Sequence, residues 1–139
     1  MKTVFIVIFI MCFFLLGVSA AILFYTQYVI YDIKEIPMDV RVSDHPGFNL
    51  NSDKLHFGRT TSPGNAERGI TVTNQYTEPL MVTIQTYGDI GGWVYIKDYT
   101  HLFEPNESRA VMLGVNVPPG RSYGDYNGTI TVLFSRVLI

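Results

Sequence analysis

The chain has 139 residues, of which 47% are apolar, and its ten basic residues are outnumbered by twelve acidic ones, for a net charge of −2. Beyond a long apolar run near the start, this length leaves room for one domain of about 100 residues. A slightly acidic chain without a basic cluster lacks the positive face that nucleic-acid binding requires, so we predict no nucleic-acid partner. The single cysteine, Cys12, excludes an intrachain disulfide and a cysteine-based zinc site.

The first predicted element is a membrane-spanning helix over residues 4–25. This run, VFIVIFIMCFFLLGVSAAILFY, contains no charged residue, and as a helix it would be roughly 33 Å long, about the thickness of a bilayer core. Lys2 precedes it, and the positive-inside tendency therefore favours a cytoplasmic N-terminus with the rest of the chain outside. We predict a single-pass protein of the cell membrane.

Three tyrosines recur at every third position where this run ends: Tyr25, Tyr28 and Tyr31. Tyrosine is enriched at membrane interfaces, so we predict that the three form an interfacial anchor and that residues 1–32 are the membrane anchor with its flank. The alternative is that they are simply the first residues of a stalk.

The same run also has features of a cleaved signal peptide. Val18-Ser19-Ala20 resembles a cleavage site, and cleavage would leave a secreted accessory domain. The chain stays apolar over residues 21–25, where a mature N-terminus is normally polar. A retained anchor is therefore the favoured interpretation.

From residue 33 to residue 139 the pattern changes to short alternating segments separated by Pro, Gly, Asn and Asp, which is typical of antiparallel strands. The predicted strands cover residues 38–42, 55–57, 68–73, 80–86, 93–97, 109–117 and 126–136. A single open sheet would leave one apolar face in water, so we predict two sheets packed face to face in one domain, 33–139.

Several segments of this region carry a resemblance: GITVTN, PLMVTI, EPNESRAVMLGVNVP and PPGRSYGDYNGTITV. Together they resemble the immunoglobulin-like domains of bacterial and archaeal cell surfaces. The resemblance implies an all-β, immunoglobulin-like antiparallel β-sandwich of about seven strands. Domains that look like this serve as spacers, adhesion modules, parts of surface filaments and appendages to enzymes, and the resemblance does not select one of these roles. A second likeness, of architecture only, is to archaellum accessory proteins of archaea, which have one membrane helix and an external β-sandwich.

The sequence contains no recognisable catalytic motif. The histidines His45, His56 and His101 are isolated, with no spacing typical of a metal site, and no GxSxG, P-loop or GxGxxG motif occurs. We therefore predict that the protein is not an enzyme and has no cofactor and no catalytic or metal-binding residue.

Two sequons make Asn106 and Asn127 candidate N-glycosylation sites in an external domain. The aspartates Asp89, Asp98 and Asp125 lie in or beside predicted turns, where carboxylates can bind calcium, but they lack the dense acidic spacing of a dedicated calcium loop.

Trp93, Tyr95 and Tyr99 are a candidate aromatic interaction patch, which would suit a protein partner or a sugar ring. The alternative is that these rings pack across sheet faces. The function predicted is that of a membrane-anchored extracytoplasmic structural or interaction protein, in contact with the lipid bilayer and a protein partner in the cell envelope. The alternative is a surface module that binds glycan or calcium through the loops around Trp93 and Asp125.

Overall fold

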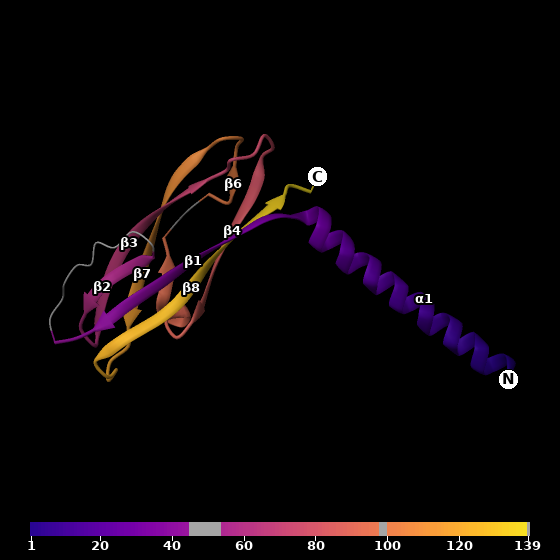
Figure 1. The fold of residues 1–139 in the computed structure, drawn as a ribbon, viewed down its shortest axis with the longest axis horizontal. Coiled ribbons are helices and arrows are strands. Elements are labelled where there is room, and N and C mark those ends of the chain that lie inside the picture. Colours follow the sequence, from indigo (N-terminus) through magenta and orange to yellow (C-terminus); the bar gives the residue numbers. More distant parts are fainter. Residues whose placement is uncertain (45–53, 98–99, 139) are drawn as a thin grey trace.

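The computed structural model describes residues 1–44, 54–97 and 100–138. Helix α1 (Lys2–Phe24) runs into one π-helical turn, η1 (Tyr25–Val29), and everything described beyond it is β-rich. None of the residues of α1 is buried, and the helix projects as a rod from one end of the β-domain (Figure 1). The predicted combination of one apolar N-terminal helix and an all-β remainder is confirmed.

The strands of the described chain extend beyond the predicted ones at several ends. They are β1 (Ile30–Val42), β2 (Leu55–Thr60), β3 (Gly64–Thr73), β4 (Leu80–Gly88), β5 (Val94–Ile96), β6 (Leu102–Phe103), β7 (Ser108–Val117) and β8 (Gly124–Arg136), with a 3-10 turn, η2 (Gly91–Trp93), before β5. Strand β6 is absent from the prediction because two residues are too few to show an alternating pattern.

The described strands form two sheets. The larger has the order β2-β1-β8-β4-β6 and the smaller the order β3-β7-β5. Pairing is antiparallel except between β1 and β2, which run parallel, so the prediction of purely antiparallel sheets is wrong at this pair. The chain between β1 and β2, residues 43–54, is long enough for this pairing, because a parallel pair needs a connection of about a dozen residues.

The core lies between the two sheets and is built from the alternate residues that the sequence pattern placed inward. Val40, Leu113 and Ile130 are completely buried, and they belong to one continuous apolar cluster. Ile70 is a partial exception, since it is half-buried at the side of this cluster. Along most strands the alternation of apolar and polar residues therefore identifies the face that is buried.

Strand β1 begins much earlier than predicted, at Ile30 instead of Met38. Its whole length pairs with β8, from Ile30 opposite Ser135 to Val42 opposite Gly124, with one irregularity after Ile30. The charged start of β1 does not alternate clearly, and its conformation is fixed by the long partner strand instead. The predicted boundary between residues 32 and 33 falls inside this strand.

Candidate functional site

The helix is the most exposed apolar surface of the described chain. The most apolar 18-residue stretch of the helical run Lys2–Val29 has a mean hydropathy of 2.9 and no buried residue. Large side chains are exposed on all sides, as shown by Phe9 at 72% and Phe14, on another face of the helix, at 69%. By length and composition this helix can cross a membrane.

The junction between helix and domain is organised around Arg136, at the end of β8. Its guanidinium carbon lies 4.9 Å from the ring centroid of Tyr28 and 4.9 Å from that of Tyr31. Its Nη1 donates a hydrogen bond of 3.0 Å to Oε2 of Glu78. One side chain thus joins η1, β1 and the segment before β4, and such cation–π contacts contribute about 0.5–1 kcal/mol each at exposed sites.

A second group of contacts extends the junction. The rings of Tyr31 and Tyr76 meet edge to face with centroids 4.6 Å apart. The Tyr76 hydroxyl donates a hydrogen bond of 2.8 Å to Oδ2 of Asp32. This bond to a carboxylate raises the pKa of Tyr76 above its ordinary value. The first residues of β1 are therefore fixed to the domain on two sides.

Asn74 holds the loop that supplies Tyr76 and Glu78 to the junction. It is completely buried, and its Nδ2 donates to the carbonyl oxygens of Glu78, Phe103 and Glu104 at 2.8, 3.2 and 3.1 Å. Its Oδ1 accepts the backbone N–H of Tyr76 at 3.1 Å. Because these bonds satisfy the buried amide, the loop has a defined conformation.

The three tyrosines predicted as the interfacial anchor have different surroundings. Tyr25 is exposed on η1, Tyr28 is on the same turn beside Arg136, and Tyr31 is already in β1. They do not continue one helical face, because the helix ends at Val29. Sequence reasoning missed Arg136, whose role has no local signal because its aromatic partners lie near the opposite end of the chain.

The residues of the predicted aromatic patch face different neighbours. The ring of Trp93 lies 5.1 Å from that of Tyr126, and the Arg121 guanidinium lies 5.0 Å from the Trp93 ring. The Tyr95 ring instead covers Gly114 on the smaller sheet, as shown by the clash of 2.1 Å that a Cβ at Gly114 would make with it. Tyr99 lies outside the described residues.

Tyr95 also belongs to a polar group on the surface. Its hydroxyl donates a hydrogen bond of 3.0 Å to Oε1 of Glu67, and the Lys97 ammonium donates one of 2.9 Å to Oε2. The bond from Lys97, followed by that from Tyr95, lowers the pKa of the Glu67 carboxyl. These contacts link β3 to β5 and to Lys97, which directly follows β5, across the intervening strand β7.

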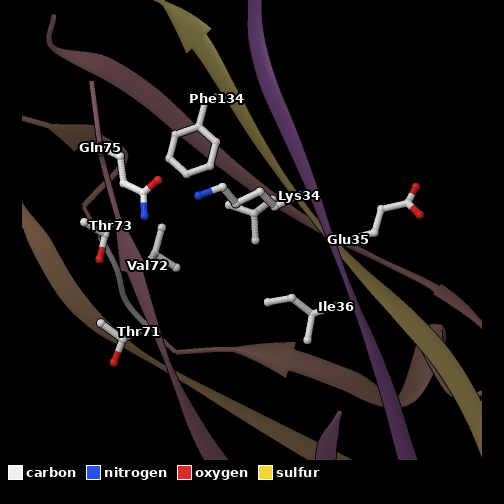
Figure 2. A pocket seen from close by; sticks show the side chains of 9 residues that line it. Lys34, Glu35, Ile36, Thr71, Val72, Thr73, Gln75 and Phe134 are labelled. Carbon is white, nitrogen blue, oxygen red and sulfur yellow. The ribbon is translucent and has the colours of Figure 1, made fainter. Parts of the chain in front are cut away.

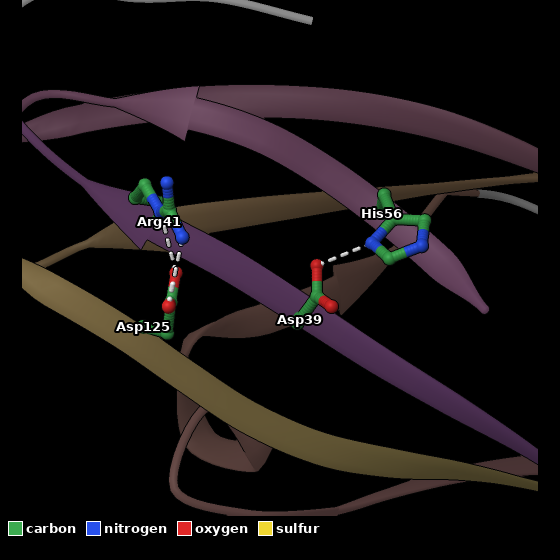
Figure 3. Close-up of polar contacts among 4 residues, drawn as sticks. All are labelled: Asp39, Arg41, His56 and Asp125. Carbon is green, nitrogen blue, oxygen red and sulfur yellow. Dashed lines mark hydrogen bonds and ion pairs between the residues drawn. The ribbon is translucent and has the colours of Figure 1, made fainter. Parts of the chain in front are cut away.

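Both candidate glycosylation sites are exposed. Asn106 lies in the turn before β7 with a φ of 59°, and Asn127 lies near the start of β8. Among the predicted aspartates, Asp89 is exposed in the turn after β4, and Asp98 lies outside the described residues. Asp125 is already engaged, because both of its oxygens accept hydrogen bonds from Arg41, at 2.7 and 3.0 Å (Figure 3).

Figure 3 also shows a contact between β1 and β2: Nδ1 of His56 lies 2.7 Å from Oδ1 of Asp39. The His56 side chain is only 10% exposed, so this polar pair is partly withdrawn from water. Within the described ranges, no three His, Cys, Asp or Glu side chains are grouped as metal ligands. The polar clusters of the domain join strands to one another.

A groove of about 450 Å³ opens between β1 and β3. Lys34 and Ile36 point into it from β1, Val72 faces them from β3, and Glu35 points away (Figure 2). The Lys34 ammonium lies 5.5 Å from the centroid of the Phe134 ring. The groove therefore combines an apolar floor with one positive charge.

Comparisons of the chain with protein-family models, curated proteins and solved structures found no match. The described polar and aromatic side chains join strands to one another and fix the junction between helix and domain, and a lysine lies at the wall of the groove between β1 and β3.

Proposed function

We propose that this chain is a membrane-anchored extracytoplasmic structural or interaction protein, whose β-domain is held close to the bilayer and contacts a protein partner of the cell envelope. The observation that carries the proposal is α1, which is apolar on all sides and has no buried residue. Removing a large apolar side chain from water contributes about 1.5–3 kcal/mol. Since the domain covers none of these side chains, a bilayer is the environment that would.

The junction supports the role of a tether. Arg136 contacts Tyr28 and Tyr31 on one side and Glu78 on the other, so the first residues after the helix are fixed to the domain instead of forming a loose linker. In a membrane, Tyr25 and Tyr28 would lie at the interface, where tyrosine is favoured. The domain would then keep a fixed distance from the surface, as a subunit of an envelope assembly requires.

We further propose that the domain is of the immunoglobulin-like type. In a constant-type immunoglobulin domain, strands B, E and D are neighbours in one sheet and C, F and G in the other. The order β3-β7-β5 corresponds to the first set and β4-β8-β1 to the second, with β1 in the place of strand G. This correspondence supports the class, and the exposed Asn106 and Asn127 suit glycosylation of an external domain.

The alternative of a calcium- or glycan-binding module has less support. Both oxygens of Asp125 are bound to Arg41, and Trp93 packs beside Tyr126 and Arg121. A calcium ion at Asp125 would have to displace an arginine.

The proposal is tested by locating the full-length protein and its ends in cells. We expect the protein to fractionate with membranes, to keep residues 1–20 in its intact mass, and to lose the β-domain to a protease added outside. Leu15→Arg should reduce membrane retention, because arginine near a helix centre costs about 2.5–3.5 kcal/mol of insertion free energy. The matched control Leu138→Arg changes an exposed leucine of the domain and should have no effect.

Recovery of a soluble chain that begins after residue 20 would contradict the anchor. For the interaction role, extraction in mild detergent should co-purify an envelope protein. A monodisperse monomer with no bound partner under these conditions would contradict that role.

A further inference from the structure

One edge of the larger sheet is only half covered in the described chain. Strand β2 pairs with β1 from Met38 to Val42, whereas residues 30–37 of β1 pair with β8 alone. Strand β3 likewise pairs with β7 and with no other described strand. The groove lies between residues 34–36 of β1 and residues 71–73 of β3. Strand β2 occupies the same side of β1 farther along, beside residues 38–42.

The backbone of β1 shows which residues face the open edge. The Ile33 N–H donates a hydrogen bond of 2.9 Å to Oδ1 of its neighbour Asp32. Backbone groups alternate in direction along a strand, so Glu35 and Pro37 face the same way as Ile33. Pro37 has no N–H, which suits a position that faces away from the partner strand. The open edge therefore offers carbonyl groups and the N–H of Glu35 to an added strand.

The groove walls suit the alternate side chains of such a strand. Ile36, Val72 and Phe134 supply apolar surface. The hydroxyl of Thr73, next to Val72 on β3, is hydrogen-bonded to Ser108 on β7 instead. An extended peptide that pairs with the edge would place every second side chain between the two sheets.

Lys34 determines the charge of the occupant. Its ammonium has no carboxylate within ion-pairing distance among the residues that the structure describes, and it lies over the face of the Phe134 ring. A lysine that points inward at a sheet edge opposes pairing with an uncharged or basic strand. A second copy of this chain that paired antiparallel and centred on Lys34 would set Lys34 against Lys34. A strand with an acidic side chain would instead compensate the charge.

We propose that this groove binds an extended acidic segment of another protein, which adds as a strand to residues 30–37 of β1 and places a carboxylate beside Lys34. The inference rests on the proposed function as an interaction protein and specifies the chemistry of the partner.

The test uses the full-length protein in detergent micelles and a fluorescent eight-residue peptide in which threonine and valine alternate. One central valine is replaced by glutamate in the acidic probe and by lysine in the basic probe. We expect the acidic probe to bind roughly 1.5- to fivefold more tightly, the range for an exposed ion pair. Lys34→Glu should reverse the preference, and the exposed control Lys54→Glu should leave it unchanged.

Hydrogen exchange gives an independent readout: saturation with the acidic probe should slow exchange in residues 30–37. Equal affinity for both probes, or unchanged exchange in this segment, would overturn the proposal. Slowed exchange that depends on protein concentration without peptide would also overturn it, by showing that a second copy fills the groove. These measurements are made in detergent and do not depend on where the protein lies in the cell. Failure of peptide binding would therefore leave the membrane anchor standing, and a failure of membrane localisation would leave the peptide result standing.

Discussion

The helix and the β-domain use the same kind of residue in opposite ways. Phe14 on α1 is 69% exposed, whereas Phe134 on β8 is 1% exposed. In α1 apolar residues surround the axis and no neighbour covers them, while in the strands they alternate with polar residues and meet across two sheets. The difference shows that apolar content alone does not make a core: in the domain tertiary packing removes the side chains from water, and in the helix only a membrane would.

The largest expected effect is a difference in the free energy of unfolding between two variants that each replace a phenylalanine by alanine. Phe134→Ala removes a buried ring from the core and should lower the free energy of unfolding of the domain by about 3–5 kcal/mol. Phe14→Ala should leave it unchanged, because no residue of α1 is buried. Denaturant unfolding followed by tryptophan fluorescence measures both variants. A comparable loss in Phe14→Ala would show that the helix contributes to the core.

Two glycines, one in the domain and one in the helix, differ in the same way, and the expected loss of stability is smaller. A Cβ at Gly114 would lie 2.1 Å from the Tyr95 ring, whereas a Cβ at Gly17 would have no atom within 4 Å. Gly114→Ala should destabilise the domain by about 1–3 kcal/mol, the usual cost of overpacking, and Gly17→Ala should not. In a Tyr95→Ala background the cost of Gly114→Ala should largely disappear. If the cost persisted there, the ring would not be its cause.

The junction is where the two regions meet, and Arg136→Met tests it. Loss of the contacts with Tyr28, Tyr31 and Glu78 should destabilise the domain by about 1–2 kcal/mol and speed hydrogen exchange over residues 25–31. Arg121→Met, which removes the arginine beside Trp93, serves as the control and should not affect that segment. Unchanged exchange over residues 25–31 in Arg136→Met would mean that the Arg136 contacts do not fix the end of the helix.

The smallest expected effect is a lower melting temperature of the β-domain at acidic pH. The hydrogen bond from Lys97 lowers the pKa of Glu67, and that from Arg41 lowers the pKa of Asp125. A lowered folded-state pKa stabilises the fold above the unfolded pKa of about 4, and this contribution is lost as the pH falls through the folded-state value. The domain should therefore melt at a slightly lower temperature below about pH 4.

Glu67→Gln should weaken this dependence, because the substituted residue has no proton to gain. Thermal melting between pH 3 and pH 7 checks the prediction. The control is Glu35→Gln, which removes a carboxylate of β1 that is not part of the group formed by Glu67, Tyr95 and Lys97. The dependence should be unaltered in the control. An identical pH profile in Glu67→Gln and the unmodified protein would contradict the role of Glu67.

By itself the sequence determined the features that depend on local pattern. Uniform apolarity predicted α1, and alternation predicted the inward faces of the longer strands, such as Val111, Leu113 and Val115 on β7. Both follow from the geometry of a single element in contact with one kind of surroundings, so neighbouring residues are enough to reveal them.

Only the tertiary structure decided the features that join distant segments. The first half of β1 reads as a polar flank and becomes a strand because β8 pairs with it, and β2 pairs with β1 in parallel. Arg136 reaches Tyr28 and Tyr31 from the other end of the sequence. Within the described residues, β2 begins opposite Met38, so no described strand pairs with the edge of β1 beside Lys34. Register and strand order are set by long-range packing, which no local pattern contains.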